Sequence, residues 1–248
     1  MRSILSKITF YALLPFLIFF SSCSSGHSRK IFRVGVDASW TPLNFEQQQP
    51  YVNGYIEELL LEIAKYNGIV FEKIPASSDA LLDGLYQHRY DAILSSMQPY
   101  EFNMAKYAFS ENFLSLGQVL ITSTTAKIQK IDDLSHKLVG IIVGSKAALV
   151  LEKYPIIIRT YPSIPSMLND LASENIDGAV LERLPAAAYV RDLFSNKLKI
   201  VGPPLTEEGL HAVTKKNNDI FLSMFNKSIE KMKKKHTLDA LEKKWQLQ

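Results

Sequence analysis

The sequence predicts an α/β protein built from two similar units. Short apolar runs typical of strands alternate with longer amphipathic stretches typical of helices, which favours sheets covered by helices. The pattern occurs twice: residues 138–142 (LVGII) resemble residues 32–36 (FRVGV), and residues 175–180 (NIDGAV) resemble residues 89–94 (RYDAIL). Ligands of such sheets bind beyond the carboxyl ends of the strands, so a cleft between two lobes is the expected site.

The first unit is predicted from four elements. Apolar residues alternate over residues 32–36, as in a strand, and follow helical spacing over residues 56–64. Asn67-Gly68 supplies an end for that helix. Asp79 is expected to cap a second helix, which leads into a strand over residues 92–94.

The second unit and the end of the chain add further helices. Ser163 and Pro165 predict the start of a helix whose apolar stripe covers residues 167–171. Residues 220–232 predict an amphipathic helix, and residues 238–245 predict a shorter one. The aromatic residues and methionines of these last helices are expected to pack in the core.

Composition argues against several classes of function. Lys and Arg number 28 against 25 Asp and Glu, and no basic stripe is interleaved with aromatic residues, so no nucleic-acid partner is expected. The sequence has neither a phosphate-binding glycine loop nor a nucleophile elbow, and its 5 histidines lack the spacing of metal ligands. We therefore expect no catalytic residue, no cofactor and no metal.

The N-terminus is typical of an export signal. Arg2 and Lys7 precede a nearly unbroken apolar run over residues 8–20, and a polar segment follows. Because that run is short for a membrane span, we interpret residues 1–22 as a signal peptide. A transmembrane anchor is the alternative.

Cys23 is the only cysteine, which excludes an internal disulfide. It lies directly behind the apolar run, and residues 20–23 (FSSC) resemble the cleavage and lipidation box of bacterial lipoproteins. The resemblance implies a mature chain that begins at Cys23 with lipid attached. Residues 23–30 would then form a flexible polar tether.

Residues 91–97 (DAILSSM) form an apolar run that ends in two hydroxyls, which predicts a buried strand presenting Ser95 and Ser96 to a cleft. With its surroundings, this segment resembles the polar amino-acid-binding proteins of bacterial ABC importers, the extracellular solute-binding family 3. The resemblance runs from about Phe32 to Trp245. Its other segments are an opening strand and pocket loop at 34–40 (VGVDASW), a Gly-aromatic turn at 53–55 (NGY), 109–113 (FSENF), 202–209 (GPPLTEEG) and a closing helix at 237–245.

The resemblance implies a two-lobed periplasmic-binding-protein fold of type II. In that fold two crossing segments join the lobes, which close over a ligand by hinge motion. The first lobe is expected to contain residues 31–118 and 205–248, and the second lobe residues 119–204. Residues 202–209 correspond to the return crossing.

In the first lobe, the resemblance assigns pocket roles to four residues. Asp37 falls where the family has an acid that reaches a ligand amide or cation. Trp40 falls where an aromatic ring covers the ligand, although an ordinary place in the core is the alternative. Ser95 and Ser96 fall at positions that offer hydroxyl, carbonyl and amide contacts.

In the second lobe, residues 144–146 (GSK) resemble a turn whose amides hold a carboxylate at a helix N-terminus. Capping of its own helix is the alternative role for Ser145. Glu182 stands where the family has an Asp that receives the ligand's ammonium group. It follows an apolar strand, where an unpaired carboxylate would be costly.

Among the departures from the family pattern, two concern pocket residues and two concern Ile56, in place of an acidic residue, and Ser78, in place of a second stacking aromatic. Asn103 stands where the family usually has an Arg that clamps the ligand's α-carboxylate, and Gln98 replaces a Ser or Thr. An Asn carries no charge and cannot reproduce the forked pairing of Arg. Either Lys146 supplies the missing cation from the opposite lobe, or the ligand lacks a free α-carboxylate. We favour the first explanation because Glu182 still offers an ammonium partner.

The expected function is capture of a small polar solute, an amino acid or close analogue, for the permease subunits of an ABC importer. The protein would be a monomeric lipoprotein in the periplasm or on the cell surface, anchored to the membrane through Cys23. One alternative is a cyclohexadienyl dehydratase-like enzyme with Glu182 as its general acid. The other alternative is a ligand-sensing protein that binds a solute other than an amino acid.

Overall fold

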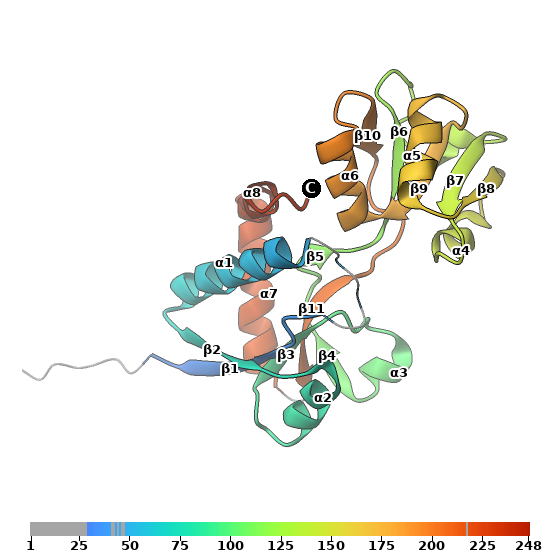
Figure 1. Cartoon of the computed structure of the whole chain (residues 1–248). Helices are drawn as coiled ribbons and strands as arrows, with labels where there is room; N and C mark the ends of the chain where they lie inside the picture. The colour runs from blue at the N-terminus through green and yellow to red at the C-terminus, as the bar shows by residue number, and fades with distance from the viewer. Residues whose placement is uncertain (1–28, 41–42, 44, 46–47, 217) are drawn as a thin grey trace, which may run out of the picture.

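The computed structural model describes residues 29–40, 43, 45, 48–216 and 218–248. The predicted signal peptide, the lipidation site at Cys23 and most of the tether lie outside the described residues. The described chain forms two β-sheets, each with its own helices and core, and two crossing segments join them (Figure 1).

The first sheet has the strand order β2-β1-β3-β11-β4, and β5 pairs with β11. Strands β1, β2 and β3 are parallel, whereas β11 runs antiparallel to β3, β4 and β5. The strands are β1 (Ile31–Val36), β2 (Val70–Pro75), β3 (Ala92–Ser95), β4 (Tyr107–Phe109), β5 (Leu114–Ser115) and β11 (Gly209–Lys215).

The second sheet has the order β10-β6-β9-β7-β8. Strand β7 is parallel to β8 and β9, and β6 is antiparallel to β9 and β10. The strands are β6 (Gln118–Ser123), β7 (Leu138–Ile142), β8 (Ile157–Tyr161), β9 (Gly178–Glu182) and β10 (Leu198–Val201).

The helices cover both faces of each sheet, because alternate strand residues point to opposite faces. In β3, Ala92 and Leu94 join the core that contains residues of α1 and α7, whereas Ile93 joins the core under α2. The helical elements are α1 (Gln49–Asn67), α2 (Ser78–Tyr86), α3 (Glu101–Met104), the 3₁₀ turn η2 (Ile131–Leu134), α4 (Ala147–Leu151), α5 (Ile164–Ala172), α6 (Arg183–Leu193), α7 (Asp219–Lys234) and α8 (Thr237–Lys244).

The two crossing segments lie side by side where the sheets meet. One leads from β5 to β6 and the other from β10 to β11 (Figure 1). The Leu205 amide donates to the Gln118 carbonyl at 2.7 Å, and the Gln118 amide donates to Thr206 Oγ1 at 2.9 Å. A Cβ at Gly117 would collide with the main chain of Thr206, so this close approach requires glycine.

Several local predictions are confirmed. Helix α1 ends at Asn67, and Gly68 follows with φ of 64°, the left-handed conformation of a glycine that ends a helix. Ser163 caps α5 by accepting from the Ser166 amide at 3.4 Å. The amphipathic helix predicted over residues 220–232 is α7.

Two local predictions are wrong. Helix α2 begins at Ser78, which puts Ser77 at the capping position and Asp79 in the first turn. Residues 53–55 are not a turn, because they lie inside α1. Packing requires glycine at position 54 of the helix, because the Trp245 ring lies where a Cβ would be. None of the helices in the described part of the chain is long and apolar enough to cross a membrane.

Candidate ligand-binding site

A cavity lies between the two sheets, beside the crossing segments. Its polar lining comes from both lobes and from the crossings: Ser96, Gln98, Gln118, Lys146, Glu182 and Glu208. Its apolar lining is Leu43, Phe45, Leu116, Leu184 and Pro185. Apolar walls with convergent polar groups are the usual composition of a small-molecule site, and this cavity has both.

The carboxyl ends of two strands position the predicted residues that line this cavity. Strand β3 ends at Ser95, so Ser96 and Gln98 follow it into the cavity from the first lobe. Strand β9 ends at Glu182, and Lys146 lies just before α4 beyond the end of β7. The structure therefore brings Ser96, Gln98, Lys146 and Glu182 together around one space.

Gln98 and Asn103 hold the main chain that follows β3. The Gln98 side-chain amide donates to the Ser96 carbonyl at 2.7 Å and to the Gly209 carbonyl at 2.9 Å. Asn103 Nδ2 donates to the Gln98 carbonyl at 2.8 Å. Asn103 thus stabilises the turn before α3 and does not line the cavity.

Asp37 and Trp40 are buried beside β1 and do not line the cavity. Asp37 Oδ1 accepts from the Ser39 amide at 2.9 Å and the Ser39 hydroxyl at 2.6 Å, which closes a tight turn. The Trp40 side chain is 3% exposed, packs in the first-lobe core and donates from Nε1 to Asn53 Oδ1 at 2.7 Å. This is the core position given above as the alternative for Trp40.

Ser95 and Ser145 also lie outside the cavity lining. Ser95 Oγ accepts from the Met97 amide at 3.0 Å, so it shapes the turn that presents Ser96. Ser145 follows Gly144, whose φ is 75°, and its hydroxyl caps no helix. That hydroxyl is buried and has no hydrogen-bond partner within the described chain. Helix α4 has only 5 residues, so a ligand carboxylate would gain little from its dipole.

Gln118 and Glu208 line the cavity but were not predicted from the sequence; Gln118 ends the first crossing and Glu208 lies on the return crossing. Gln118 is the Cα partner of Glu182 in the antiparallel pair of β6 and β9, so the two side chains lie on the same face. Glu208 accepts a hydrogen bond from the Thr206 hydroxyl. Residues 202–209 were expected to form the return crossing, and a crossing between lobes passes beside an interlobe cavity. That expectation could have indicated Glu208 as a lining residue.

The model of the bacterial extracellular solute-binding proteins, family 3, matches residues 32–248. This chain belongs to that family. The L-cystine-binding protein TcyJ of Escherichia coli (strain K12) is 27% identical over 216 residues, which cover 86% of this chain and 81% of TcyJ. The arginine-binding extracellular protein ArtP of Bacillus subtilis (strain 168) is 23% identical, over 91% of this chain and 89% of ArtP.

Solved structures share the fold of this family 3 protein. The L-cystine solute receptor of Neisseria gonorrhoeae, in its unliganded open conformation, matches with a TM-score of 0.68 and 20% identity, over 88% of this chain and 93% of the receptor. A substrate-binding domain of a putative amino acid ABC transporter from Streptococcus pneumoniae matches at 0.64 and 24%, over 88% of this chain and 100% of that domain. The predicted two-lobed type II fold is confirmed, and family membership confirms a binding protein over an enzyme.

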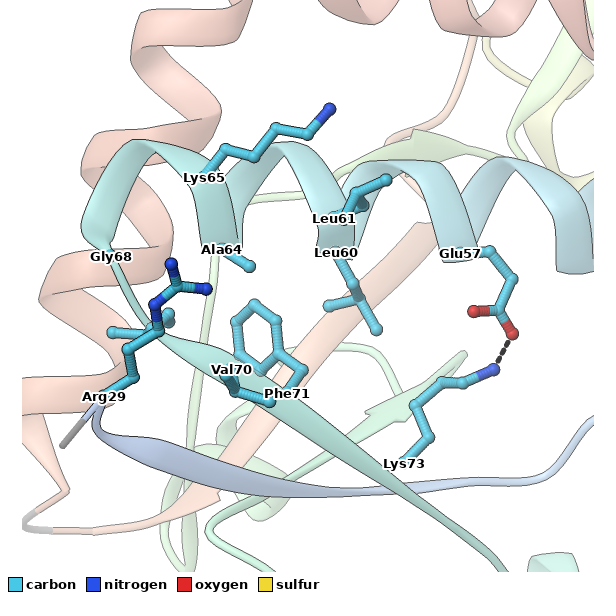
Figure 2. A pocket seen from close by; sticks show the side chains of 11 residues that line it. Arg29, Glu57, Leu60, Leu61, Ala64, Lys65, Gly68, Val70, Phe71 and Lys73 are labelled. Carbon is cyan, nitrogen blue, oxygen red and sulfur yellow. Dashed lines mark ion pairs between the residues drawn. The ribbon is translucent and has the colours of Figure 1, made fainter. Parts of the chain in front are cut away.

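This solute-binding protein has a second hollow, a groove between α1 and β2 (Figure 2). Lys73 of β2 forms an ion pair with Glu57 of α1 across it, and burial lowers the pKa of Lys73. The groove is larger, about 510 Å³ against about 100 Å³ for the interlobe cavity. Its Lys73–Glu57 pair is already satisfied and Lys65 is paired with Glu62, so the described groove offers a cation, Arg29, but no open carboxylate. Convergent unpaired polar groups favour the interlobe cavity as the ligand site.

Proposed function

We propose that this chain is the substrate-binding protein of an ABC importer and holds an amino acid between its two lobes. The observation that carries the proposal is the meeting of Lys146 and Glu182 with Ser96 in one cavity that both lobes line. A free amino acid carries one carboxylate and one ammonium group, and this cavity offers one partner for each. The relatives named for binding cystine and arginine support the same class of ligand.

In the proposed complex, Lys146 pairs with the ligand carboxylate and Glu182 receives the ammonium group. Ser96 offers its hydroxyl and main-chain groups from the opposite lobe. Charge-assisted hydrogen bonds of this kind are the strong ones in ligand recognition. Lys146 thereby replaces the Arg that the family usually has at the position of Asn103.

The other predicted site residues are assigned supporting roles. Asp37, Ser95 and Asn103 fix turns next to the cavity through main-chain hydrogen bonds, and Trp40 anchors the loop after β1 to α1 through Asn53. The Ser145 hydroxyl and Asp37 Oδ2 are both buried without a hydrogen-bond partner in the described chain, and neither residue lines the cavity.

Lobe closure would occur by a hinge at the crossing segments. Gly117 and Gly202 lie on these two segments, and Gly202 has a positive φ of 70°. Closure traps the ligand and excludes water, and the closed protein is then recognised by the permease subunits. Residues 31–118 with 205–248 would move against residues 119–204.

The lipid anchor is a proposal supported by the sequence around Cys23. The protein would be a monomer, tethered by residues 23–30 in the periplasm or at the cell surface. Metabolic labelling of growing cells with a clickable fatty acid tests this directly. Labelling that is lost in Cys23→Ser supports the anchor, and equal labelling of both proteins would refute it.

Calorimetric titration of the purified protein with the standard L-amino acids tests the proposed function. We expect at least one to bind, and we expect Glu182→Gln to weaken its binding by about tenfold or more because a charge-assisted contact is lost. Glu152→Gln, on the exposed end of α4, is the matched control and should bind like the wild type. Binding of no amino acid, or equal affinities in the two variants, would refute the proposal.

A further inference from the structure

The crossing-segment side of the cavity has more hydrogen-bond acceptors than an amino acid backbone needs. Gln118 comes from the first crossing and Glu208 from the return crossing, and both line the cavity together with Glu182. We propose that Gln118 and Glu208 form a subsite for a positively charged ligand side chain, so that the ligand is a cationic amino acid. This inference rests on the proposed function.

Gln118 is a buried acceptor without a donor. The residue is 3% exposed, and its Oε1 has no hydrogen-bond partner among the described residues. Its main-chain amide and carbonyl are already bonded to Thr206 and Leu205. An unsatisfied buried amide oxygen is costly in free energy, so a ligand that donates a hydrogen bond to it would bind more favourably.

Glu208 is a carboxylate whose charge is not neutralised by the described chain. The Thr206 hydroxyl donates to its Oε2, which orients the carboxylate but brings no charge. The ion pairs among described residues include neither Glu208 nor Glu182 nor Lys146. All three charges of the cavity are therefore open to a ligand.

The charges of the cavity favour a cationic ligand. Lys146 and Glu182 balance the carboxylate and ammonium groups of any amino acid, which leaves Glu208 as an extra negative charge. A neutral ligand would leave that carboxylate without a cation in the closed cleft, and an acidic ligand would add repulsion. A guanidinium or ammonium group supplies both the charge and the donors that Glu208 and Gln118 lack.

The place of Glu208 at the edge of the cavity suits a long side chain. Glu208 and Gln98 also line a neighbouring hollow of about 750 Å³, which Glu207 and His211 help to form. Glu111 lies in that hollow too, but it is paired with Lys233. A side chain that reaches Glu208 therefore comes beside a hollow whose unpaired carboxylates in the described chain are Glu207 and Glu208.

Titration of the wild-type protein with matched ligands tests the inference. We expect L-arginine or L-lysine to bind at least about tenfold more tightly than L-glutamine and L-norleucine, which have similar length without the charge. L-glutamate should bind most weakly. Tighter binding of a neutral or acidic amino acid would overturn the cationic subsite and leave the proposed function standing. Binding of no amino acid would overturn both.

A pair of variants assigns the effect to Glu208. Glu208→Gln keeps the shape of the side chain, and we expect it to weaken L-arginine or L-lysine binding by about tenfold or more while neutral ligands change by less than about threefold. Glu152→Gln is the control, because Glu152 is exposed at the end of α4 and lines neither the interlobe cavity nor the neighbouring hollow. Equal loss for cationic and neutral ligands, or no loss in Glu208→Gln, would overturn the assignment.

Discussion

Arg183 Nη2 lies 2.5 Å from Glu242 Oε2, and this ion pair joins the first residue of α6 in the second lobe to α8 in the first. A second contact reinforces it, because Arg191 Nη1 donates to the Gln246 carbonyl at 2.7 Å. Leu184, next to Arg183, packs into the first-lobe core. The C-terminal segment thus approaches α6 directly (Figure 1), and the residue before α6 is the proposed ammonium partner Glu182.

Removal of Arg183 should destabilise the protein in a pH-dependent way. Burial raises the pKa of Glu242 above its ordinary value of 4.5, and the Arg183 charge opposes that rise. In Arg183→Leu, Glu242 keeps its burial cost and loses its partner, so we expect a loss of about 3 kcal/mol in the free energy of unfolding near pH 7. The measurement is urea unfolding followed by circular dichroism.

The sign of the pH dependence follows from the raised pKa. A carboxyl whose pKa is higher in the folded state binds more protons there, so stability falls as pH rises from 4.5 through the folded pKa. The loss in Arg183→Leu should therefore shrink towards pH 4.5. The double variant Arg183→Leu with Glu242→Leu should recover most of the stability. An equal loss of unfolding free energy in Arg183→Leu near pH 7 and near pH 4.5 would contradict this account.

His211 should make the protein less stable in acid. Its side chain is 5% exposed, and burial lowers its pKa below 6.5 even though Nδ1 lies 2.9 Å from the Ser110 carbonyl. The unfolded chain then binds the proton more readily, so stability is lost as pH falls below 6.5 towards the folded pKa. The slope cannot exceed about 1.4 kcal/mol per pH unit for one proton.

Unfolding free energies measured between pH 5 and 7 test the role of His211. His211→Gln keeps a side-chain donor for the Ser110 carbonyl and removes the titration, so its stability should vary less with pH than that of the wild type. His236→Gln is the control, since His236 is exposed at the start of α8. An unchanged slope in His211→Gln would exclude His211 as the source of acid sensitivity.

Gly54→Ala should destabilise the protein although alanine favours helices. The intrinsic preference for Ala over Gly inside a helix is about 1 kcal/mol. The new methyl group would collide with the Trp245 ring, which is held by a 2.9 Å hydrogen bond from its Nε1 to Glu58 Oε2. Overpacking typically costs about 1–3 kcal/mol, so we expect a lower melting temperature in a thermal denaturation scan.

A second substitution separates the collision from other effects of Gly54→Ala. Trp245→Leu alone should destabilise the protein because it empties part of the contact between α1 and the C-terminal segment. Adding Gly54→Ala to Trp245→Leu should then cost little, since the ring that blocks the methyl group is absent. Fully additive losses would show that Trp245 is not the reason for glycine at this position.

The sequence predicted the parts of the site that follow strands. Ser96 and Glu182 come directly after apolar runs, and the carboxyl ends of such strands meet in α/β folds. Trp40 could not be placed in the same way, because an aromatic residue after a strand suits both a pocket wall and a core. Its hydrogen bond to Asn53 depends on how α1 packs, which periodicity does not specify.

Gln118 and Glu208 were missed for a different physical reason. Glu208 lies in the irregular return crossing, where neither the two-residue nor the 3.6-residue period applies, and Gln118 is the first residue of β6. Their position in the cavity depends on the pairing of two segments that are far apart in sequence, through Leu205 and Thr206. Such a relationship is a property of the tertiary fold, so local sequence patterns carry little information about it.

Lys146 should be required for ligands that have a free carboxylate. We expect Lys146→Ala to weaken binding of the best amino acid by about tenfold or more, because the structure gives the carboxylate no Arg at position 103. The same amino acid in its amide form lacks that charge, so it should bind weakly and equally to wild type and variant. Calorimetric titration of both ligands against both proteins measures the coupling between Lys146 and the carboxylate.

Lys153→Ala is the control for Lys146→Ala, because Lys153 is an exposed lysine of the same lobe. Undiminished amino acid binding in Lys146→Ala would mean that another group holds the carboxylate, and it would remove Lys146 as the replacement for the missing Arg.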